Sequence, residues 1–294
     1  MTALTTEALH ADARGLDARP LPEIARALAD GQCAAAASVA AAIPAICGAA
    51  AAMAHSLRLG GRLIYAAAGS SGLMAAADAH ELGQTFSIPA ARIRILMAGG
   101  LPSGVEMPGA TEDDTSAVSR DLADADQRDS VIAVSASGTT PYTLAAARTA
   151  KAGGATVIAV ANNPGAPLFD LADHAICLAT PPELVAGSTR MGAGTAQKIA
   201  LNMLSTLMAV ELGHIHDGMM VNVVADNIKL RARASGIVAT IAHVSREAAD
   251  AALAAAAGRV KPAVLLASGV PSAAEADRIL GQSEDNLRAA LARL

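Results

Sequence analysis

Five short apolar runs, most of them separated by helical patterns, occupy the first two thirds of the chain. The runs are continuous rather than alternating, as strands buried on both faces are; they span Arg62–Gly69, Arg92–Gly99, Ser130–Ser137, Ala155–Asn162 and His174–Thr180. Between them, helical patterns cover Ser71–Phe86, Pro141–Ala152 and a short stretch near Pro167–Leu171. Strands that alternate with helices predict an α/β fold with a parallel sheet and right-handed crossovers.

Helical patterns also flank this region on both sides. Residues 21–59 precede the first strand, and Thr189–Leu212 and Met219–Ala256 follow the last. In the tail, Ser272 can accept hydrogen bonds from the first-turn amides of a helix that begins at Ala273. We therefore expect four parts, namely an N-terminal helical segment (1–55), an α/β domain (56–215), a helical extension (216–258) and a small helical module (259–294).

The stretch Gln32–His55 has no charged side chain except its terminal histidine and is long enough to span a bilayer. It is mostly alanine, which contributes little to membrane insertion, and Pro44 and Gly48 interrupt it. We predict a buried helix pair or a kinked helix and no membrane partner. Residues 1–20 carry charges and lack the apolar core of a signal peptide, so we expect a cytoplasmic protein.

Composition excludes two further classes of protein. The net charge is −5 and there is no Trp, so the basic face and stacking aromatics of a nucleic-acid binder are missing. The three cysteines are too few and too scattered for a disulfide framework or a zinc site, and we expect buried thiols. The histidines do not have a metal-ligand spacing either, so we expect no metal.

Two turns rich in serine and glycine each follow a predicted strand and precede a predicted helix. The first contains Ser70, Ser71 and Gly72, and the second contains Ser135, Ser137, Gly138, Thr139 and Thr140. Ligands of an open parallel sheet bind beyond the carboxyl ends of its strands, where amides and hydroxyls can hold an anion. Neither turn is a Walker A loop or a dinucleotide fingerprint. The pattern leaves two interpretations open, a phosphate or phosphosugar site and a pair of ordinary turns.

Two carboxylates could supply acid and base chemistry. Glu81 lies on the alanine-rich helix after the first turn, and Glu112 follows a Gly/Pro-rich stretch. The alternatives are a solvated helix-face charge for Glu81 and helix-capping acids for residues 112–114. Later in the chain, Ser188 or Thr189 could cap the long helix. Arg190 and Lys198 could face an anion or be surface charges.

At these residues the chain resembles a known family. Residues 182–190 with 194–198 resemble a signature that N-acetylmuramic acid 6-phosphate etherases share with the animal glucokinase regulatory protein. Residues 137–142 resemble the family's second phosphosugar loop, and Leu4–Glu7 resembles its amino-terminal signature. The resemblance covers nearly the whole chain in order. It implies a sugar isomerase (SIS) fold, a three-layer sandwich around a central five-stranded parallel sheet, with a helical C-terminal region and a homodimeric assembly.

The resemblance also implies an activity. These etherases are carbon–oxygen lyases of cell-wall recycling that cleave the D-lactyl ether of a phosphorylated amino sugar by elimination and hydration, without metal or redox cofactor. The family's proton donor falls on Glu81 and its second acid/base on Glu112, and which of them takes the C2 proton stays open. Its phosphosugar contacts fall on the two turns and on Ser188, Thr189, Arg190 and Lys198.

The chain departs from the family at four of these positions. Leu73, Thr139 and Gly192 stand where the etherases usually carry a basic residue, and His80 stands where they usually carry Ser. Phosphate and carboxylate groups favour Arg or Lys partners, so these losses favour a changed ligand. Two other functions stay open at this point, a non-catalytic phosphosugar sensor and a phosphosugar isomerase with Glu81 as base.

Overall fold

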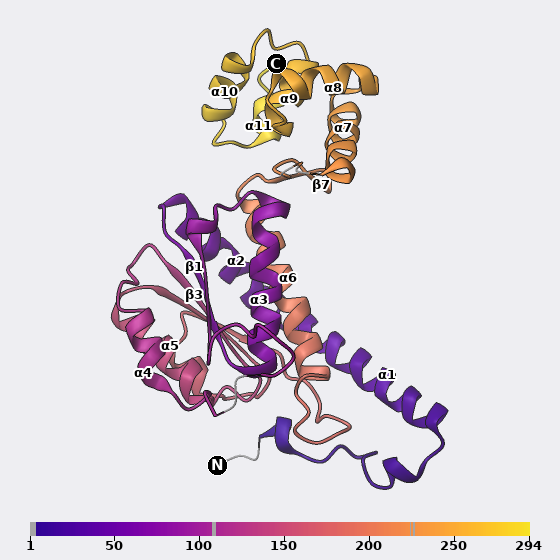
Figure 1. Ribbon diagram of the computed structural model, residues 1–294, viewed down its shortest axis with the longest axis vertical. Helices are drawn as coiled ribbons and strands as arrows, with labels where there is room; N and C mark the ends of the chain where they lie inside the picture. The colour runs from indigo at the N-terminus through magenta and orange to yellow at the C-terminus, as the bar shows by residue number, and fades with distance from the viewer. Residues whose placement is uncertain (1–3, 108–109, 224, 226) are drawn as a thin grey trace. The chain divides into compact units, whose positions relative to one another are not determined.

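A computed structural model describes residues 4–107, 110–223, 225 and 227–294 (Figure 1). Internal contacts divide the chain into two compact units. The first unit comprises Met1–His80 and Ala91–Ser205, and the second comprises Glu81–Ala90 and Thr206–Leu294. The finer division into four parts remains a prediction.

The first unit is built around a parallel five-stranded sheet, which confirms the predicted fold class. Its strand order is β2-β1-β3-β4-β5. All residues of β1 and β3 are buried, which explains why the sequence runs there are continuous rather than alternating. The strands are β1 (Leu63–Ala67), β2 (Ile93–Met97), β3 (Ser130–Ser135), β4 (Thr156–Ala161) and β5 (His174–Cys177).

Helices cover both faces of the sheet and make three layers, as Figure 1 shows. On one face, α4 (Thr115–Asp121) and α5 (Pro141–Ala152) share a core with residues such as Val131 and Ala133 of β3. The other face carries α2 (Ile43–Arg58) and the first parts of α3 (Gly69–Phe86) and α6 (Gly192–Glu211). On that face the Ser56 hydroxyl of α2 lies 2.7 Å from the Ser130 hydroxyl of β3.

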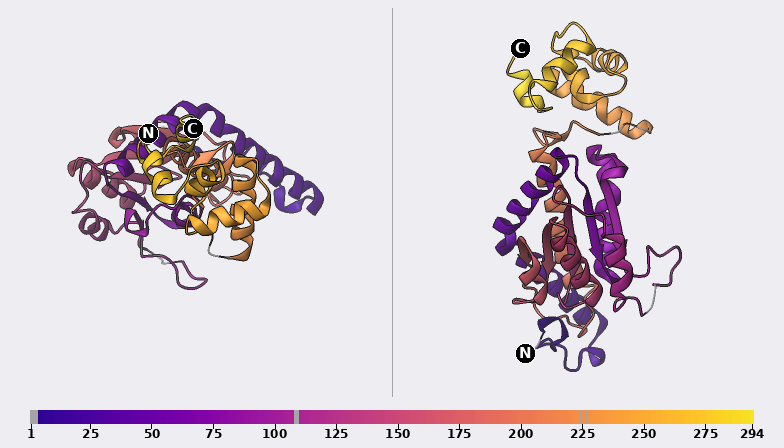
Figure 2. Two further views of the ribbon diagram at one scale, coloured as in Figure 1. Left: turned by 90° about the horizontal axis from the view of Figure 1, so that it is seen from above. Right: turned by 90° about the vertical axis from the view of Figure 1, so that its left-hand side faces the viewer.

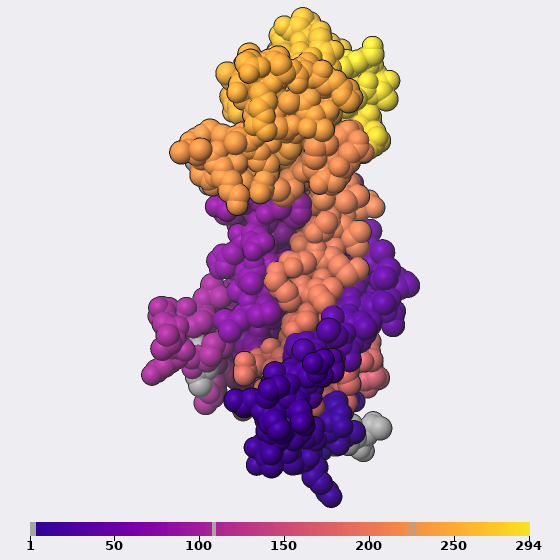
Figure 3. All heavy atoms as spheres, turned by 90° about the vertical axis from the view of Figure 1, so that its right-hand side faces the viewer, coloured from indigo at the N-terminus to yellow at the C-terminus, as the bar shows by residue number. Residues whose placement is uncertain are grey.

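The N-terminal helical segment is divided as its sequence predicts, but only half of it is buried. A 3-10 turn at Ser38–Ala42 separates α1 (Leu21–Ala37) from α2. Helix α2 buries Ile46 and Met53 among others, whereas Ala35 is the one buried residue of α1, which lies at the surface in Figure 3. By length and composition alone, Leu21–Arg58 is apolar enough to cross a membrane, with a mean hydropathy of 1.9 over an 18-residue window, but a single helix of this kind is weak evidence, because core helices meet the same criterion.

The expectation of buried thiols is wrong for two cysteines. Cys33 of α1 and Cys47 of α2 are exposed, and Cys177 is partly buried. Both exposed thiols lie on helix faces that the rest of the chain does not cover. The general tendency of free cysteines to be buried does not predict which helix faces stay uncovered.

The second unit is mostly helical (Figure 2) and has its own core, which includes Val238, Val264 and Leu265. After α6 the chain forms a small hairpin, β6 (Ile215–His216) and β7 (Met219–Met220), so the helix expected from Met219 starts only at Ile228. Asp217 and Gly218 both have positive φ, as a two-residue hairpin turn requires. The predicted cap is confirmed, because the Ser272 hydroxyl accepts from the Glu275 amide at 3.2 Å. The helices are α7 (Ile228–Ala242), α8 (Arg246–Ala255), α9 (Val260–Ala267), α10 (Ala273–Gly281) and α11 (Leu287–Leu291).

Candidate active site

The two serine-containing turns lie at the same edge of the sheet. Strands β1 and β3 are neighbours, and Ala67 at the end of β1 pairs with Val134 near the end of β3. Helix α3 begins at Gly69, so Ser70 and Ser71 lie in its first turn rather than in a loop before it. Ser71 and Gly72 are buried and Ser70 is half-buried. The first-turn amides of α3 therefore lie at the edge where a ligand of such a sheet binds.

The second turn is a preformed cup of hydroxyl groups. The Ser135 hydroxyl lies 2.8 Å from that of Thr140 and 3.4 Å from that of Ser137. Ser137 in turn accepts from the amide and the hydroxyl of Thr139, at 3.1 and 2.9 Å. Because these bonds fix the four side chains without a ligand, little ordering is left for binding to impose.

Gly138 sets the path of this cup. Its φ is +68°, in the left-handed region that favours glycine, and its amide donates to the Ser135 hydroxyl at 3.0 Å. A Cβ at this position would lie 2.4 Å from the Cβ of Ala166, so no side chain fits.

Glu112 lies between the two turns. Its backbone carbonyl accepts from the Tyr142 amide at the start of α5, at 2.9 Å. Its carboxylate approaches the first turn so closely that a Cβ on Gly69 would lie 2.7 Å from Oε1. The side chain is exposed. The structure thus brings a carboxylate to the junction of the two turns.

The capping interpretation applies to a neighbour of Glu112. The Asp114 carboxylate accepts from the Ser116 amide at 3.0 Å and caps α4. Hydrogen bonds from the Ser116 side chain and backbone lower the pKa of Asp114.

Glu81 is placed differently from Glu112. It is exposed on α3, on the helix face that also exposes Leu73 and Ala77. At the rise of an α-helix it lies about 16 Å beyond Ser70 along the axis. The helix by itself therefore does not bring Glu81 next to the first turn.

A buried carboxylate that the sequence does not single out joins α3 to its neighbours. Asp78 accepts from the hydroxyl of Tyr65 at 2.9 Å, from the Asn202 amide at 2.8 Å and from the Ser205 hydroxyl at 2.9 Å. Burial raises the pKa of Asp78, and the hydrogen bonds from Ser205 and Asn202 oppose that rise. Lys198 donates to Asn202 at 2.5 Å, so this predicted anion contact has a partner inside the protein.

The segment before α6 is organised by Glu183 rather than by its hydroxyl residues. The buried Glu183 carboxylate accepts from the amides of Gly192 and Ala193, at 3.0 and 2.8 Å, and caps α6. The prediction that Ser188 or Thr189 caps this helix is wrong, because α6 begins only at Gly192. Ser188 and Thr189 are half-buried in the preceding turn, and Arg190 beside them is exposed.

The amino-terminal signature docks beside the hydroxyl cup. The Thr6 amide donates to the Asn163 side chain at 3.2 Å, and Asn163 donates to the Thr6 hydroxyl at 3.0 Å and to the Ser137 carbonyl at 3.1 Å. Glu7 reaches the segment before α6, since a Cβ on Gly187 would lie 3.4 Å from its Oε2. Motifs far apart in the sequence therefore gather around the second turn.

These groups suit proton transfer on an anionic ligand. The cup offers hydroxyls, the first turn of α3 offers amides, and Glu112 offers a carboxylate within the same edge of the sheet. In the part of the chain that the structure describes, no cluster of three His, Cys, Asp or Glu side chains could hold a metal ion.

Comparison with known proteins agrees with this fold. Residues 105–212 match the SIS domain family. A solved protein of Bacteroides fragilis, described as a candidate phosphosugar isomerase involved in capsule formation, shares the fold, with a TM-score of 0.50 and 20% identity over 64% of this chain and 88% of its own.

Two curated relatives match along nearly their whole length. The N-acetylmuramic acid 6-phosphate etherase of Deinococcus radiodurans is 44% identical, over 94% of this chain and 92% of the relative. The protein of the same name from Streptomyces avermitilis is 41% identical, over 99% and 94% of the two chains. On this similarity along nearly the whole chain, the chain belongs to the N-acetylmuramic acid 6-phosphate etherase family.

Proposed function

We propose that the protein is a lyase that removes the lactyl group from N-acetylmuramic acid 6-phosphate, giving N-acetylglucosamine 6-phosphate and D-lactate. The observation that carries the proposal is the Glu112 carboxylate at the junction of the two serine-containing turns. Relatives at 44% and 41% identity that carry this activity in their names support it.

The chemistry is an elimination, which needs two proton transfers, followed by the addition of one water. In the open-chain sugar, the C1 carbonyl stabilises the carbanion that forms when a carboxylate takes the C2 proton. The C3–O bond then breaks, and a carboxylic acid protonates the departing ether oxygen to give lactate. Water adds across the C2–C3 double bond, with its oxygen at C3, which restores the saturated sugar.

We assign the phosphate to the hydroxyl cup and the carbon chain of the opened sugar to the region of Glu112. The cup presents four hydroxyls at the turn that leads into α5, and hydroxyl groups can donate hydrogen bonds to an anion. Ser70, Ser71 and Gly72 line the other side. This arrangement does not require cations at Leu73, Thr139 or Gly192, because hydroxyls and amides supply the contacts. The role of Glu81 as proton donor rests on the family resemblance.

The decisive measurement is D-lactate release from N-acetylmuramic acid 6-phosphate. Glu112→Gln removes an acid/base group while keeping its shape, so the rate should fall by about 10²-fold or more. Asp113→Asn is the matched control, because Asp113 is an adjacent exposed acid. A Glu112→Gln enzyme that keeps most of the wild-type rate contradicts the proposal.

A second measurement divides the two roles between the glutamates. In deuterium oxide, the residue that takes the C2 proton is needed for exchange at C2, whereas the residue that protonates the ether oxygen is not. We expect one of Glu81→Gln and Glu112→Gln to retain exchange while both lose lactate release. Loss of neither activity in Glu81→Gln would remove Glu81 from the mechanism.

We also propose that the enzyme is a cytoplasmic homodimer. The proposal rests on the family resemblance and on the surface of α1, where Ala25, Ala29 and Cys33 form an exposed stripe of small apolar side chains. Small side chains at helical spacing let a second helix approach closely.

A further inference from the structure

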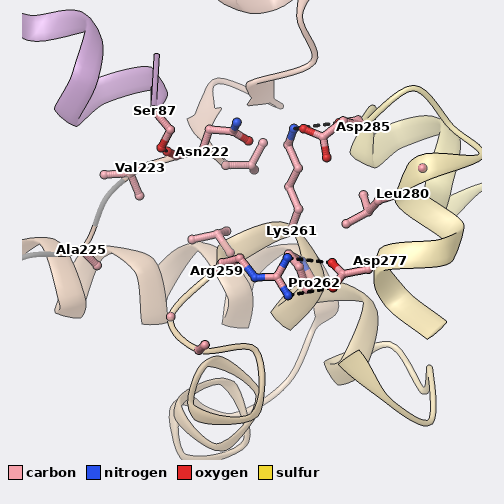
Figure 4. A pocket seen from close by; sticks show the side chains of 15 residues that line it. Ser87, Asn222, Val223, Ala225, Arg259, Lys261, Pro262, Asp277, Leu280 and Asp285 are labelled. Carbon is pink, nitrogen blue, oxygen red and sulfur yellow. Dashed lines mark hydrogen bonds and ion pairs between the residues drawn. The ribbon is translucent and has the colours of Figure 1, made fainter. Parts of the chain in front are cut away.

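The second unit contains a cavity of about 670 Å³ that is open to solvent and has no part in the chemistry above (Figure 4). Its walls come from the residue after α3, the residues after β7, and the segments around the starts of α9 and the end of α10. Its volume lies in the range of small-molecule sites, which is about 300–1,000 Å³.

One wall of the cavity is apolar and aliphatic. Val221, Val223, Val260 and Leu280 are each 6% exposed or less. None of the described residues that line the cavity is aromatic. An aliphatic wall of this kind suits a branched aliphatic group.

The polar groups of the cavity are two ion pairs, both drawn in Figure 4. Arg259 donates to both carboxylate oxygens of Asp277, at 2.7 and 2.9 Å. Lys261 donates to the carboxylate of Asp285 at 2.5 Å and to its carbonyl at 2.7 Å. The Lys261 side chain is only 4% exposed, whereas the Asp285 side chain is 54% exposed. The Asp285 carboxylate is therefore accessible to solvent, and the Lys261 ammonium is buried in the protein.

Each pair retains hydrogen-bonding capacity. A guanidinium has five N–H donors, and Arg259 uses three of them on Asp277 and on the Ala256 carbonyl. An ammonium has three donors, and Lys261 uses two. The carboxylates have lone pairs to spare. The two cationic and two anionic side chains together carry no net charge. The cavity therefore offers hydrogen-bond donors and acceptors side by side, but no excess positive charge that would attract an anion.

We propose that this cavity binds a zwitterionic short peptide with an aliphatic side chain. Its carboxylate would take the remaining N–H groups of Arg259 and Lys261, and its ammonium would lie against the carboxylates of Asp277 and Asp285. The aliphatic side chain would pack on the wall formed by Val260 and Leu280. This inference is independent of the proposed lyase activity.

Ser87 connects the cavity to the helix that carries Glu81. Ser87 follows the last residue of α3, its hydroxyl donates to the Asn222 carbonyl, and both residues line the cavity. The cavity that would hold the peptide therefore includes the residue that directly follows α3.

The test is calorimetric titration of the full chain with alanyl-valine and with its N-acetyl and C-amide derivatives. Each derivative lacks one charged end, so each should bind at least about tenfold more weakly than the free dipeptide. Excess N-acetylglucosamine 6-phosphate should leave dipeptide binding unchanged, because the phosphosugar is assigned to the other site.

Two variants and one matched control complete the test. Arg259→Gln and Asp277→Asn should each weaken dipeptide binding at least about tenfold. Arg278→Gln is the control, because Arg278 is 54% exposed and paired with Glu275, much as Arg259 is 53% exposed and paired with Asp277. Equal binding of the blocked dipeptides, no heat with any dipeptide at millimolar concentration, or an equal effect of Arg278→Gln would overturn the proposal. Competition by inorganic phosphate would overturn it too, since it would make the cavity an anion site.

Discussion

The carboxylate of Glu112 and the bare Cα of Gly69 occupy adjacent space at the edge of the sheet. Gly69 has a φ of +53°, and its missing side chain leaves room for Oε1 of Glu112. The position of the proposed acid/base therefore depends on a residue that itself has no reactive group.

Gly69→Ala should reduce lactate release more than it reduces stability. The new Cβ displaces the Glu112 side chain, and the positive φ adds about 1 kcal/mol of strain. Gly100→Ala is the control, because Gly100 has a φ of +85° and no heavy atom within 4 Å of an added Cβ. Steady-state kinetics and urea unfolding of both variants check this. An equal loss of activity in both would show that the strain alone matters.

Asp78 should make stability fall with rising pH. Burial raises its pKa in the folded chain above the value of 3.8 in the unfolded chain. The folded chain therefore holds the proton more tightly, and this contribution to stability is lost as pH rises from 3.8 through the folded-state pKa. Asp78→Asn should remove that part of the pH dependence, which urea unfolding between pH 4 and 8 measures. Parallel stability curves for variant and wild type would contradict this.

At the scale of single elements, the sequence predicts the strands well and the helix starts less well. Strands such as β3 are buried on both faces, and this burial requires a continuous apolar run that is easily recognised in the sequence. The start of α6 is set by Glu183, which lies nine positions before the amide it caps. Capping residues are usually sought within one to three residues before the helix, and that criterion selects Ser188 and Thr189 instead.

The Glu183 cap gives a prediction about α6. Glu183→Ala leaves the amides of Gly192 and Ala193 without their acceptor and should cost about 1–2 kcal/mol of unfolding free energy. Glu23→Ala, which removes an exposed first-turn acid of α1, should change stability by less than about 0.5 kcal/mol. Chemical denaturation of both variants measures the difference, and equal effects would exclude the capping role.

The site follows the same rule, in that local patterns can be predicted from the sequence and contacts between distant residues cannot. The two turns and Glu112 follow from strand ends and from family motifs, because the carboxyl ends of neighbouring parallel strands must meet at one edge. The bonds of Asp78 to Tyr65 and Asn202 join residues far apart in the chain, and one aspartate on an alanine-rich helix carries no local signal of them. The hairpin at Met219 was not predicted because its strands are only two residues long, too short to produce a recognisable pattern.

At the scale of the whole molecule, the second unit should be sensitive to acid. Burial lowers the pKa of His214 to about 4, below the ordinary value of 6.5, with Lys261 adding to the effect. The unfolded chain then binds more protons between these values, so stability present above pH 6.5 is lost as pH falls towards 4, by up to about 3 kcal/mol. His214→Gln should flatten this part of the curve in urea unfolding. An unchanged slope would mean that His214 titrates normally.

The assembly prediction concerns α1. Ala29→Arg should weaken self-association because it places a charge in the exposed apolar stripe, whereas Asp30→Arg, on a different face of the same helix, should not. Sedimentation at micromolar concentration measures both. A wild-type chain that sediments as a monomer would remove the homodimer.

The bonds between Thr6 and Asn163 also bear on how the protein is made. These residues are 157 positions apart, so the amino-terminal signature leaves the ribosome long before its docking site exists. The segment around Thr6 cannot dock until β4 and the residues after it have been synthesised and β4 has joined the sheet. Docking of this segment is then a late event in biogenesis, and the hydroxyl cup beside it is complete only after the segment around Thr6 has bound to Asn163.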